Sequence, residues 1–201
     1  MMQYINIPVV FKKAFSKDFC QKIIDIQKNT SFKKGTVSEA NNLNLKWRDS
    51  NIIFTDEQWI YDAVVPWFEK ANKEGKYNFK LDWYEPAQVT KYDKNGFYGW
   101  HEDENSTAYP NDHHNINFRN KIRKLSCSVL LSEPNTYEGG DFDFAIPMAR
   151  HANLMYKKIT LKSLEVGTMI VFPSFTLHRV NPVTKGTRYS LVVWALGPTY
   201  D

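Results

Sequence analysis

The spacing of apolar residues along the chain changes near residue 77. Before that point, apolar side chains recur every three or four residues in two stretches, 17–29 and 55–75, which is the period of a helix with one buried face. After it, they alternate with polar residues or form short runs bounded by Gly and Pro, as in β-strands. The pattern predicts a helical N-terminal part over about 1–76 and a β-rich part over about 77–201.

The two predicted helices have recognisable ends. Ser16 can cap the first helix, and Thr55 with Gln58 has the spacing of a capping box for the second. Pro66 lies within the second helix and should kink it or divide it in two. The Asn-rich stretch 31–51 between the helices predicts a surface loop that could lie beside an active site.

The β-rich part predicts short strands at 77–81, 124–131, 141–146, 168–173 and 188–196. Gly139 and Gly140 form a turn signal before the third of them. Helices do not alternate with these strands, which favours a β-sandwich or jelly roll over a parallel sheet. We therefore expect an α+β, mainly β fold with the N-terminal helices packed on one sheet. Two stretches between strands, 106–121 and 148–158, could be mobile lids.

Composition limits the classes of protein to which the chain can belong. A chain of 201 residues, 42% of them apolar, fits a single domain with its own core. The net charge of +4 arises from scattered residues, which does not favour nucleic-acid binding. Cys20 and Cys127 are too few for a disulfide framework, and the first residues lack a leader pattern. Because no apolar run is long enough to span a membrane, these features predict a soluble, cytoplasmic protein.

One cluster of metal-ligand residue types stands out. In GWHEDEN, residues 99–105, His101 and Asp103 are two positions apart and would share one face of a strand. His178 follows the predicted strand 168–173 and could meet them. Two imidazoles and one carboxylate are the ligands of the facial triad that binds non-haem Fe(II). Taken singly, each feature also fits a solvated turn or a hydrogen-bonded histidine at a strand boundary.

An anion-binding group follows at a fixed spacing. Arg188 lies ten residues after His178, inside an otherwise apolar strand. A buried guanidinium needs an anionic partner, and it can bind a carboxylate through two parallel hydrogen bonds. Ser190 would lie on the same face and could donate a third. A dicarboxylate such as 2-oxoglutarate could therefore chelate iron through its 2-oxo acid end and rest its far carboxylate on Arg188 and Ser190.

These residues occur in a familiar order. Tyr92, the His101/Asp103 pair, the Gly139–Gly140 turn and the motif FPSxxxHxVxPVxxGxRxSLxxW over 172–194 resemble the Fe(II)- and 2-oxoglutarate-dependent dioxygenases. The similarity is greatest to the prolyl 4-hydroxylase-like branch, which includes bacterial proline/lysine hydroxylase-domain proteins, and it covers about 88–198. It implies a double-stranded β-helix, a jelly-roll variant, with helices packed against it.

The resemblance also implies roles for individual residues. His101, Asp103 and His178 would bind iron, and Arg188 would bind the distal carboxylate of 2-oxoglutarate. Tyr92 matches the tyrosine whose hydroxyl helps to hold that carboxylate, although a core tyrosine on a strand fits the sequence equally well. Three aromatic residues could line the mouth of the substrate site or could simply pack beside it: Tyr98, Trp100 and Trp194.

The implied activity is hydroxylation of a C–H bond, with 2-oxoglutarate and O₂ converted to succinate and CO₂ and with ascorbate as an optional reductant. A prolyl residue in a protein or peptide is the leading substrate; a free amino acid or another small molecule comes next. A metal- or sugar-binding jelly roll without turnover is the alternative from a different class. Arg188 beside a complete triad argues against it, because a simple binding module needs no buried anion site next to an open metal. No feature of the sequence indicates an oligomeric state.

Overall fold

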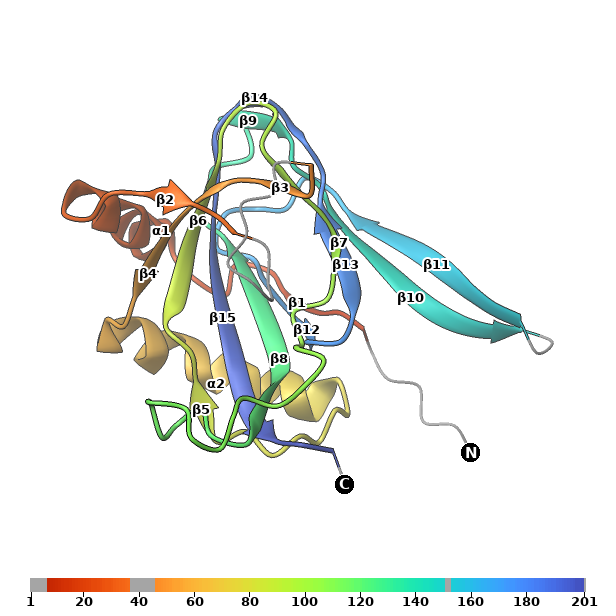
Figure 1. Ribbon diagram of the computed structural model, residues 1–201. Coiled ribbons are helices and arrows are strands. Elements are labelled where there is room, and N and C mark those ends of the chain that lie inside the picture. The colour runs from red at the N-terminus through yellow and green to blue at the C-terminus, as the bar shows by residue number, and fades with distance from the viewer. Residues whose placement is uncertain (1–6, 37–45, 151–152, 201) are drawn as a thin grey trace.

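The computed structural model describes residues 7–36, 46–150 and 153–200, and it consists mainly of antiparallel strands with two helices (Figure 1). In these residues the larger sheet has eight strands. Its order is β1 (Val9–Phe11), β12 (Met169–Pro173), β8 (Lys121–Leu130), β15 (Arg188–Pro198), β6 (Ala87–Tyr92), β4 (Asn51–Thr55) and β2 (Lys33–Lys34), and β5 (Trp83–Tyr84) also pairs with β15.

A second sheet and a short ribbon complete the β-structure. The second sheet runs in the order β11 (Asn153–Leu161), β10 (Phe142–Arg150), β13 (Leu177–Val180), β7 (Phe97–His101) and β3 (Arg48–Asp49). The ribbon pairs β14 (Val183–Gly186) with β9 (Tyr137–Gly139). The mainly β class and the antiparallel arrangement predicted from the sequence are therefore confirmed.

The helices are α1 (Lys17–Ile24), continued by the 3₁₀ turn η1 (Asp25–Lys28), and α2 (Gln58–Glu74). Ser16 caps α1 as predicted, since its Oγ accepts a hydrogen bond from the backbone N–H of Phe19 at 3.2 Å. The predicted capping box of α2 does not form. Thr55 is the last residue of β4, and Gln58 is already the first residue of the helix, where its amide donates to Asp62.

Pro66 does not divide α2, which is continuous from Gln58 to Glu74. Val64 and Phe68 lie on either side of Pro66 and are both fully buried. Their packing keeps both halves of the helix on the sheet, although the proline removes one backbone hydrogen bond.

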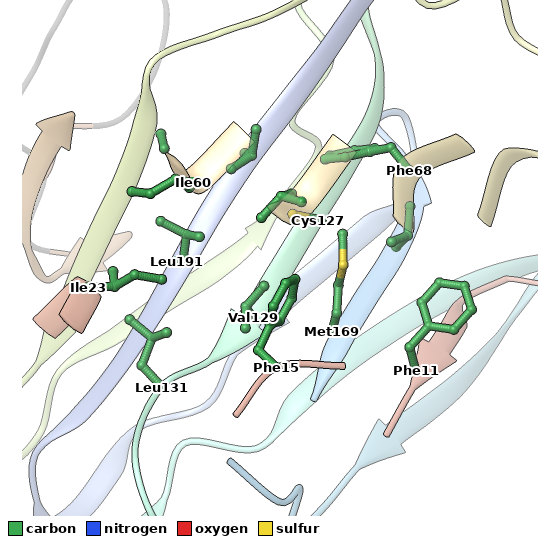
Figure 2. Packing of buried hydrophobic residues seen from close by; sticks show 14 of the residues in the cluster. Phe11, Phe15, Ile23, Ile60, Phe68, Cys127, Val129, Leu131, Met169 and Leu191 are labelled. Carbon is green, nitrogen blue, oxygen red and sulfur yellow. The ribbon is translucent and has the colours of Figure 1, made fainter. Parts of the chain in front are cut away.

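The helices cover one face of the larger sheet, and the alternation of β8 and β15 explains why. Figure 2 shows Ile60 and Phe68 of α2 packed over Cys127, Val129 and Leu191. Residues at alternate positions on these strands share a face, so each such side chain removed from water stabilises the fold by about 1.5–3 kcal/mol. The intervening side chains point to the opposite face, which is left for chemistry.

The N-terminal part contains more β-structure than its apolar pattern predicts. Strands β2, β3 and β4 fall within or beside the predicted loop 31–51, of which 37–45 lies outside the described residues. Conversely, 77–81 is not a strand. The side chain of Asn72 in α2 binds both the N–H and the carbonyl of Phe79, and Asn78 has a positive φ of 55°, so this segment is tied to the helix as a loop.

The two predicted lids have different structures. The stretch 106–121 is a loop of turns that leads into β8. The stretch 148–158 instead belongs to the β10–β11 hairpin, in which Met148 pairs with Met155, and this arm points away from the body of the molecule (Figure 1). Its tip, 151–152, lies outside the described residues.

Within the described chain, neither helix is both long and apolar enough to cross a membrane. Cys20 and Cys127 are free thiols buried in the core, where they pack as small apolar groups. Burial raises the pKa of the Cys20 thiol to about 11, so this residue stays protonated. The cytoplasmic location inferred from the sequence stays a prediction.

Candidate metal centre and its cavity

The second sheet brings His101, Asp103 and His178 together. His101 ends β7, and His178 lies directly opposite it on the neighbouring strand β13. The carboxylate of Asp103 lies 3.6 Å from Nε2 of His101 and 3.7 Å from Nε2 of His178. One ligand atom from each residue lies within 4.8 Å of the others, so the cluster can hold a single metal ion.

Asp103 reaches this cluster differently from the way the sequence pattern suggested. It lies in a bend just beyond β7, not on the strand with His101. Its backbone N–H donates to the carbonyl of Ser174 at 2.9 Å, and its own carbonyl accepts from Nη1 of Arg123 at 3.1 Å. The loop that carries the carboxylate is therefore fixed from two sides.

Both histidines are oriented for binding through Nε2. Nδ1 of His101 lies 2.7 Å from the carbonyl of Gly99, and Nδ1 of His178 lies 2.8 Å from the carbonyl of Thr176. A proton on Nδ1 satisfies these carbonyls and leaves the lone pair of Nε2 facing Asp103.

Electrostatics favour the ligand forms of the site. Burial, followed by the nearby His101, lowers the pKa of His178 to about 4, so its imidazole is neutral at pH 7. Burial also opposes ionisation of Asp103, but His178, His101 and Arg123 outweigh it and hold the pKa of the carboxyl below its usual range. A neutral imidazole and an ionised carboxylate are the forms that bind a divalent cation.

A cavity of about 750 Å³ opens beside the cluster. Its wall comes from the face of β6, β8 and β15 opposite the helices, together with β4, β7, β13 and the start of the loop 106–121. Phe142 and Phe172 pack around the ring of His178, with ring centroids 5.5 and 4.6 Å away. The metal site therefore has an apolar wall on one side and the open cavity on the other.

The candidate aromatic residues divide into two groups. Tyr98 lines the cavity and stacks on the ring of His101, with 3.5 Å between centroids, and burial raises the pKa of its hydroxyl to about 12. Trp194 also lines the cavity, and its buried indole N–H has no hydrogen-bond partner among the described residues. Trp100 does not line it; this ring lies 4.7 Å from the guanidinium of Arg179, which binds Asp143.

The candidate anion site lies beside Tyr92. Arg188 and Tyr92 are directly opposite each other on β15 and β6, and Cζ of the arginine lies 5.6 Å from the tyrosine ring centroid. Arg188 is 2% exposed, and its Nε and Nη1 have no partner among the described residues. Tyr92 and Ser190 line the main cavity, whereas Arg188 lines a small pocket that shares Phe142 with it.

The glycine turn has a specific steric role here. Gly140 has a φ of +65°, and a Cβ atom at this position would lie 2.7 Å from Cδ of Arg188. The absence of a side chain at residue 140 leaves the space that the arginine stem occupies.

Three charged residues of the site, Arg48, Glu85 and Arg123, were not identified from the sequence. Arg123 donates to both oxygens of Glu85, and Tyr109 from the loop 106–121 donates to the same carboxylate at 3.1 Å. The guanidinium of Arg123 also lies 4.1 Å from the ring centroid of Trp194. Arg48 of β3 is the third of these residues. Arg48 and Arg123 lie in locally polar stretches, and Glu85 lies outside the predicted strands, so no break in the apolar pattern indicated them.

A cluster of two histidines and one aspartate at the edge of a cavity, with an unpaired buried arginine near by, defines a class of mononuclear metal proteins. Residues 87–196 match the sequence model of the 2OG-Fe(II) oxygenase superfamily, and the chain belongs to that superfamily. A PKHD-type hydroxylase of Janthinobacterium sp. (strain Marseille) is 34% identical over 118 residues, which cover 59% of this chain and 46% of that protein. A PKHD-type hydroxylase of Pseudoalteromonas atlantica is 31% identical over 109 residues, covering 54% and 42%. The matched region thus spans less than half the length of these relatives.

Solved structures show the same fold at lower identity. A viral collagen prolyl hydroxylase from Paramecium Bursaria Chlorella virus-1, solved with 2OG, superposes with a TM-score of 0.64 at 18% identity and covers 97% of both chains. A prolyl hydroxylase from Trichoplax adhaerens, solved with a hypoxia inducible factor peptide, gives a TM-score of 0.67 at 15% identity over 94% of this chain and 82% of that one. Membership of the superfamily implies Fe(II) as cofactor and 2-oxoglutarate and O₂ as cosubstrates.

Proposed function

We propose that this protein is an Fe(II)- and 2-oxoglutarate-dependent hydroxylase that acts on a prolyl residue of a protein or peptide. The observation that carries this proposal is the His101, Asp103 and His178 cluster on a cavity that also reaches Tyr92, beyond which the buried Arg188 has unpaired donors. The proposal includes a double-stranded β-helix formed by the two sheets and a single domain over 1–201.

The residues of the cluster fit ferrous iron. His101 and His178 would each offer Nε2, and Asp103 would offer one carboxylate oxygen; three protein ligands leave positions for a chelating 2-oxo acid and for O₂. When bound, the iron supplies the oxidative chemistry, and the protein supplies orientation and exclusion of water. The backbone contacts of Asp103 and the Nδ1 contacts of both histidines keep the ligand atoms in place.

The second proposed assignment is the site of the distal carboxylate of 2-oxoglutarate. Nε and Nη1 of Arg188 have no partner among the described residues, and binding the carboxylate would remove the cost of burying a guanidinium without an anion. Tyr92 lies opposite on the neighbouring strand, and Ser190 lies two residues further along the same face. Their hydroxyls would donate to the same carboxylate. Binding here would place the 2-oxo acid end toward the iron ligands.

A prolyl substrate fits the remaining wall of the cavity. Tyr98 and Trp194 present aromatic surface beside the iron ligands, which suits a pyrrolidine ring, and the indole N–H of Trp194 is free to donate to a peptide carbonyl. Phe54 also lines the cavity and is 55% exposed, so the cavity opens to the surface and could accept an extended peptide. The PKHD-type and prolyl hydroxylase relatives support this substrate class. A free amino acid would fill only the inner part of this cavity.

The proposal is tested by turnover. Protein prepared anaerobically is given Fe(II), ascorbate and 2-oxoglutarate, then exposed to O₂ with or without a panel of proline-containing peptides. We expect iron-dependent succinate that rises with at least one peptide, and a gain of one oxygen atom on its proline by mass spectrometry. No succinate, combined with no binding of 2-oxoglutarate to the iron-loaded protein, would instead indicate a binding module without turnover.

A further inference from the structure

Arg48 is a buried cation in the cavity wall without an acidic partner among the described residues. It is 6% exposed, its Nε donates to Oγ of Ser50 at 2.7 Å, and its Nη1 donates to the carbonyl of Thr36 at 2.9 Å. Both acceptors are neutral. Nη2 is buried and has no hydrogen-bond partner in the described chain. Burying a guanidinium in this way is costly unless an anion completes the site.

This cation lies close to the proposed iron site. Arg48 on β3 is directly opposite Tyr98 on β7, and its Cζ lies 4.6 Å from the centroid of the tyrosine ring. The same ring stacks on His101. Arg48, Tyr98 and Thr36 all line the main cavity. The guanidinium is therefore separated from an iron ligand by one aromatic ring, within reach of a group adjacent to the reacting residue.

Among the residues that the structure describes, the other charges of the cavity leave Arg48 without a countercharge. Arg123 is neutralised by Glu85 through two hydrogen bonds. With the assignments proposed above, the two carboxylates of 2-oxoglutarate and that of Asp103 balance the iron and Arg188. Glu102 also lines the cavity, but its side chain is exposed, and it forms no ion pair with Arg48 in the described structure.

We propose that Arg48 binds a carboxylate of the substrate next to the residue that is hydroxylated, an inference that rests on the proposed hydroxylase activity. Nη2 supplies the free donor, and the ion pair forms in a desolvated wall where it discriminates strongly between charged and neutral groups. The carboxylate comes from an Asp or Glu beside the target proline, or from the α-carboxylate of a free amino acid.

The test measures binding and turnover on matched ligands. Two proline peptides that differ only in Asp or Asn next to the proline, together with L-proline and its amide, are titrated anaerobically into the Fe(II)–2-oxoglutarate complex. We expect the carboxylate-bearing member of one pair to bind at least about tenfold more tightly than its neutral partner. The peptide pair and the proline pair distinguish the two sources of the carboxylate.

Variants assign the effect to this residue. Arg48→Gln should abolish the difference within the preferred pair and leave the affinity for the neutral member and for 2-oxoglutarate unchanged. Arg48→Glu should reverse the preference toward a peptide with Lys at the same position. Arg119→Gln, which removes the same charge from an exposed arginine outside the cavity lining, is the matched control and should change nothing.

Three outcomes would overturn the assignment. Equal affinities within both pairs would show that no carboxylate is recognised. Retention of the preference in Arg48→Gln would place recognition elsewhere. A loss of 2-oxoglutarate affinity in Arg48→Gln, with the substrate preference intact, would make Arg48 part of the cosubstrate site. Failure of the hydroxylase proposal would appear separately, as absence of iron-dependent succinate with every ligand.

Discussion

The guanidinium of Arg123 donates to both carboxylate oxygens of Glu85, from Nε to Oε1 at 2.7 Å and from Nη2 to Oε2 at 2.6 Å. Its remaining nitrogen, Nη1, donates to the backbone carbonyl of Asp103. Glu85 also accepts from Tyr109, so one partly buried ion pair connects a proposed iron ligand to the loop 106–121 at the cavity. Glu85 is thus linked to the backbone of Asp103 through Arg123.

Replacing Glu85 by Gln should weaken iron binding. Loss of the charge leaves the partly buried Arg123 without its anion, which destabilises the fold, and the guanidinium no longer holds the carbonyl of Asp103 in place. Because groups that orient metal ligands typically change metal affinity 10–100-fold, we expect a rise of about tenfold or more in the dissociation constant for Fe(II). Anaerobic titration with Fe(II) measures it.

The control for this variant is Glu138→Gln, which breaks the exposed pair with Lys185. That change should cost less than about 1 kcal/mol and leave iron affinity unaltered. The affinity of iron-saturated Glu85→Gln for 2-oxoglutarate should stay close to wild type. Unchanged iron affinity in Glu85→Gln would show that the ion pair is only structural.

Replacing Gly140 by Ala should lower the affinity for 2-oxoglutarate. The new methyl group would lie 2.7 Å from Cδ of Arg188, so the proposed anion-binding side chain must move. Gly139→Ala is the matched control, because Gly139 also has a positive φ but its Cβ would meet the carbonyl of Pro182. Both variants should lose about 1–2 kcal/mol of stability from left-handed backbone strain. Gly139→Ala should lose more than this, because its Cβ would lie 2.4 Å from the backbone carbonyl oxygen of Pro182. Calorimetric titration should give a lower affinity for 2-oxoglutarate in Gly140→Ala than in Gly139→Ala. Equal affinities would show that Arg188 does not bind the cosubstrate.

Substitutions of two neighbouring residues on β15 should affect different properties, one the folding stability and the other the binding of 2-oxoglutarate. Leu191→Ala creates a cavity under the helices and should cost about 2–5 kcal/mol of unfolding free energy while 2-oxoglutarate affinity is retained. Ser190→Ala should leave stability nearly unchanged and weaken 2-oxoglutarate binding by about 1 kcal/mol, the usual value of one hydrogen bond. Denaturant unfolding and ligand titration on both variants check this. The reverse pattern would mean that the two faces of β15 are misassigned.

Metal bound by His101, Asp103 and His178 should stabilise the folded protein. A ligand that binds only the folded state, at 100 times its dissociation constant, adds about 2.7 kcal/mol to stability. Fe(II) added anaerobically, or Mn(II) in its place, should therefore raise the melting temperature of the wild type. Asp103→Ala and His178→Ala should lose this shift, whereas His113→Ala, in the loop 106–121, should retain it. A retained shift in both triad variants would place the metal elsewhere.

Much of the site could be predicted because its residue types break a local pattern. His178 directly follows an apolar strand, and Arg188 lies ten residues later inside another one. The structure places His101 and His178 opposite each other on adjacent strands. The helix cap at Thr55 was predicted wrongly, because the spacing of two residues does not show where a preceding strand ends.

By itself, the sequence determined the mainly β class, the two helices on one sheet, and the residue types of the candidate metal and anion sites, because strand and helix periods are local properties. The placement of Arg123 depended on tertiary structure. Simple alternation puts it on the same face as Leu125, but the register between β8 and β15 shifts at Leu196, and the arginine instead lies over Trp194 in the cavity. The pairing of Arg123 with Glu85 and of Arg48 with Tyr98 likewise joins residues far apart in the chain. Such contacts depend on register and topology, which no local spacing encodes.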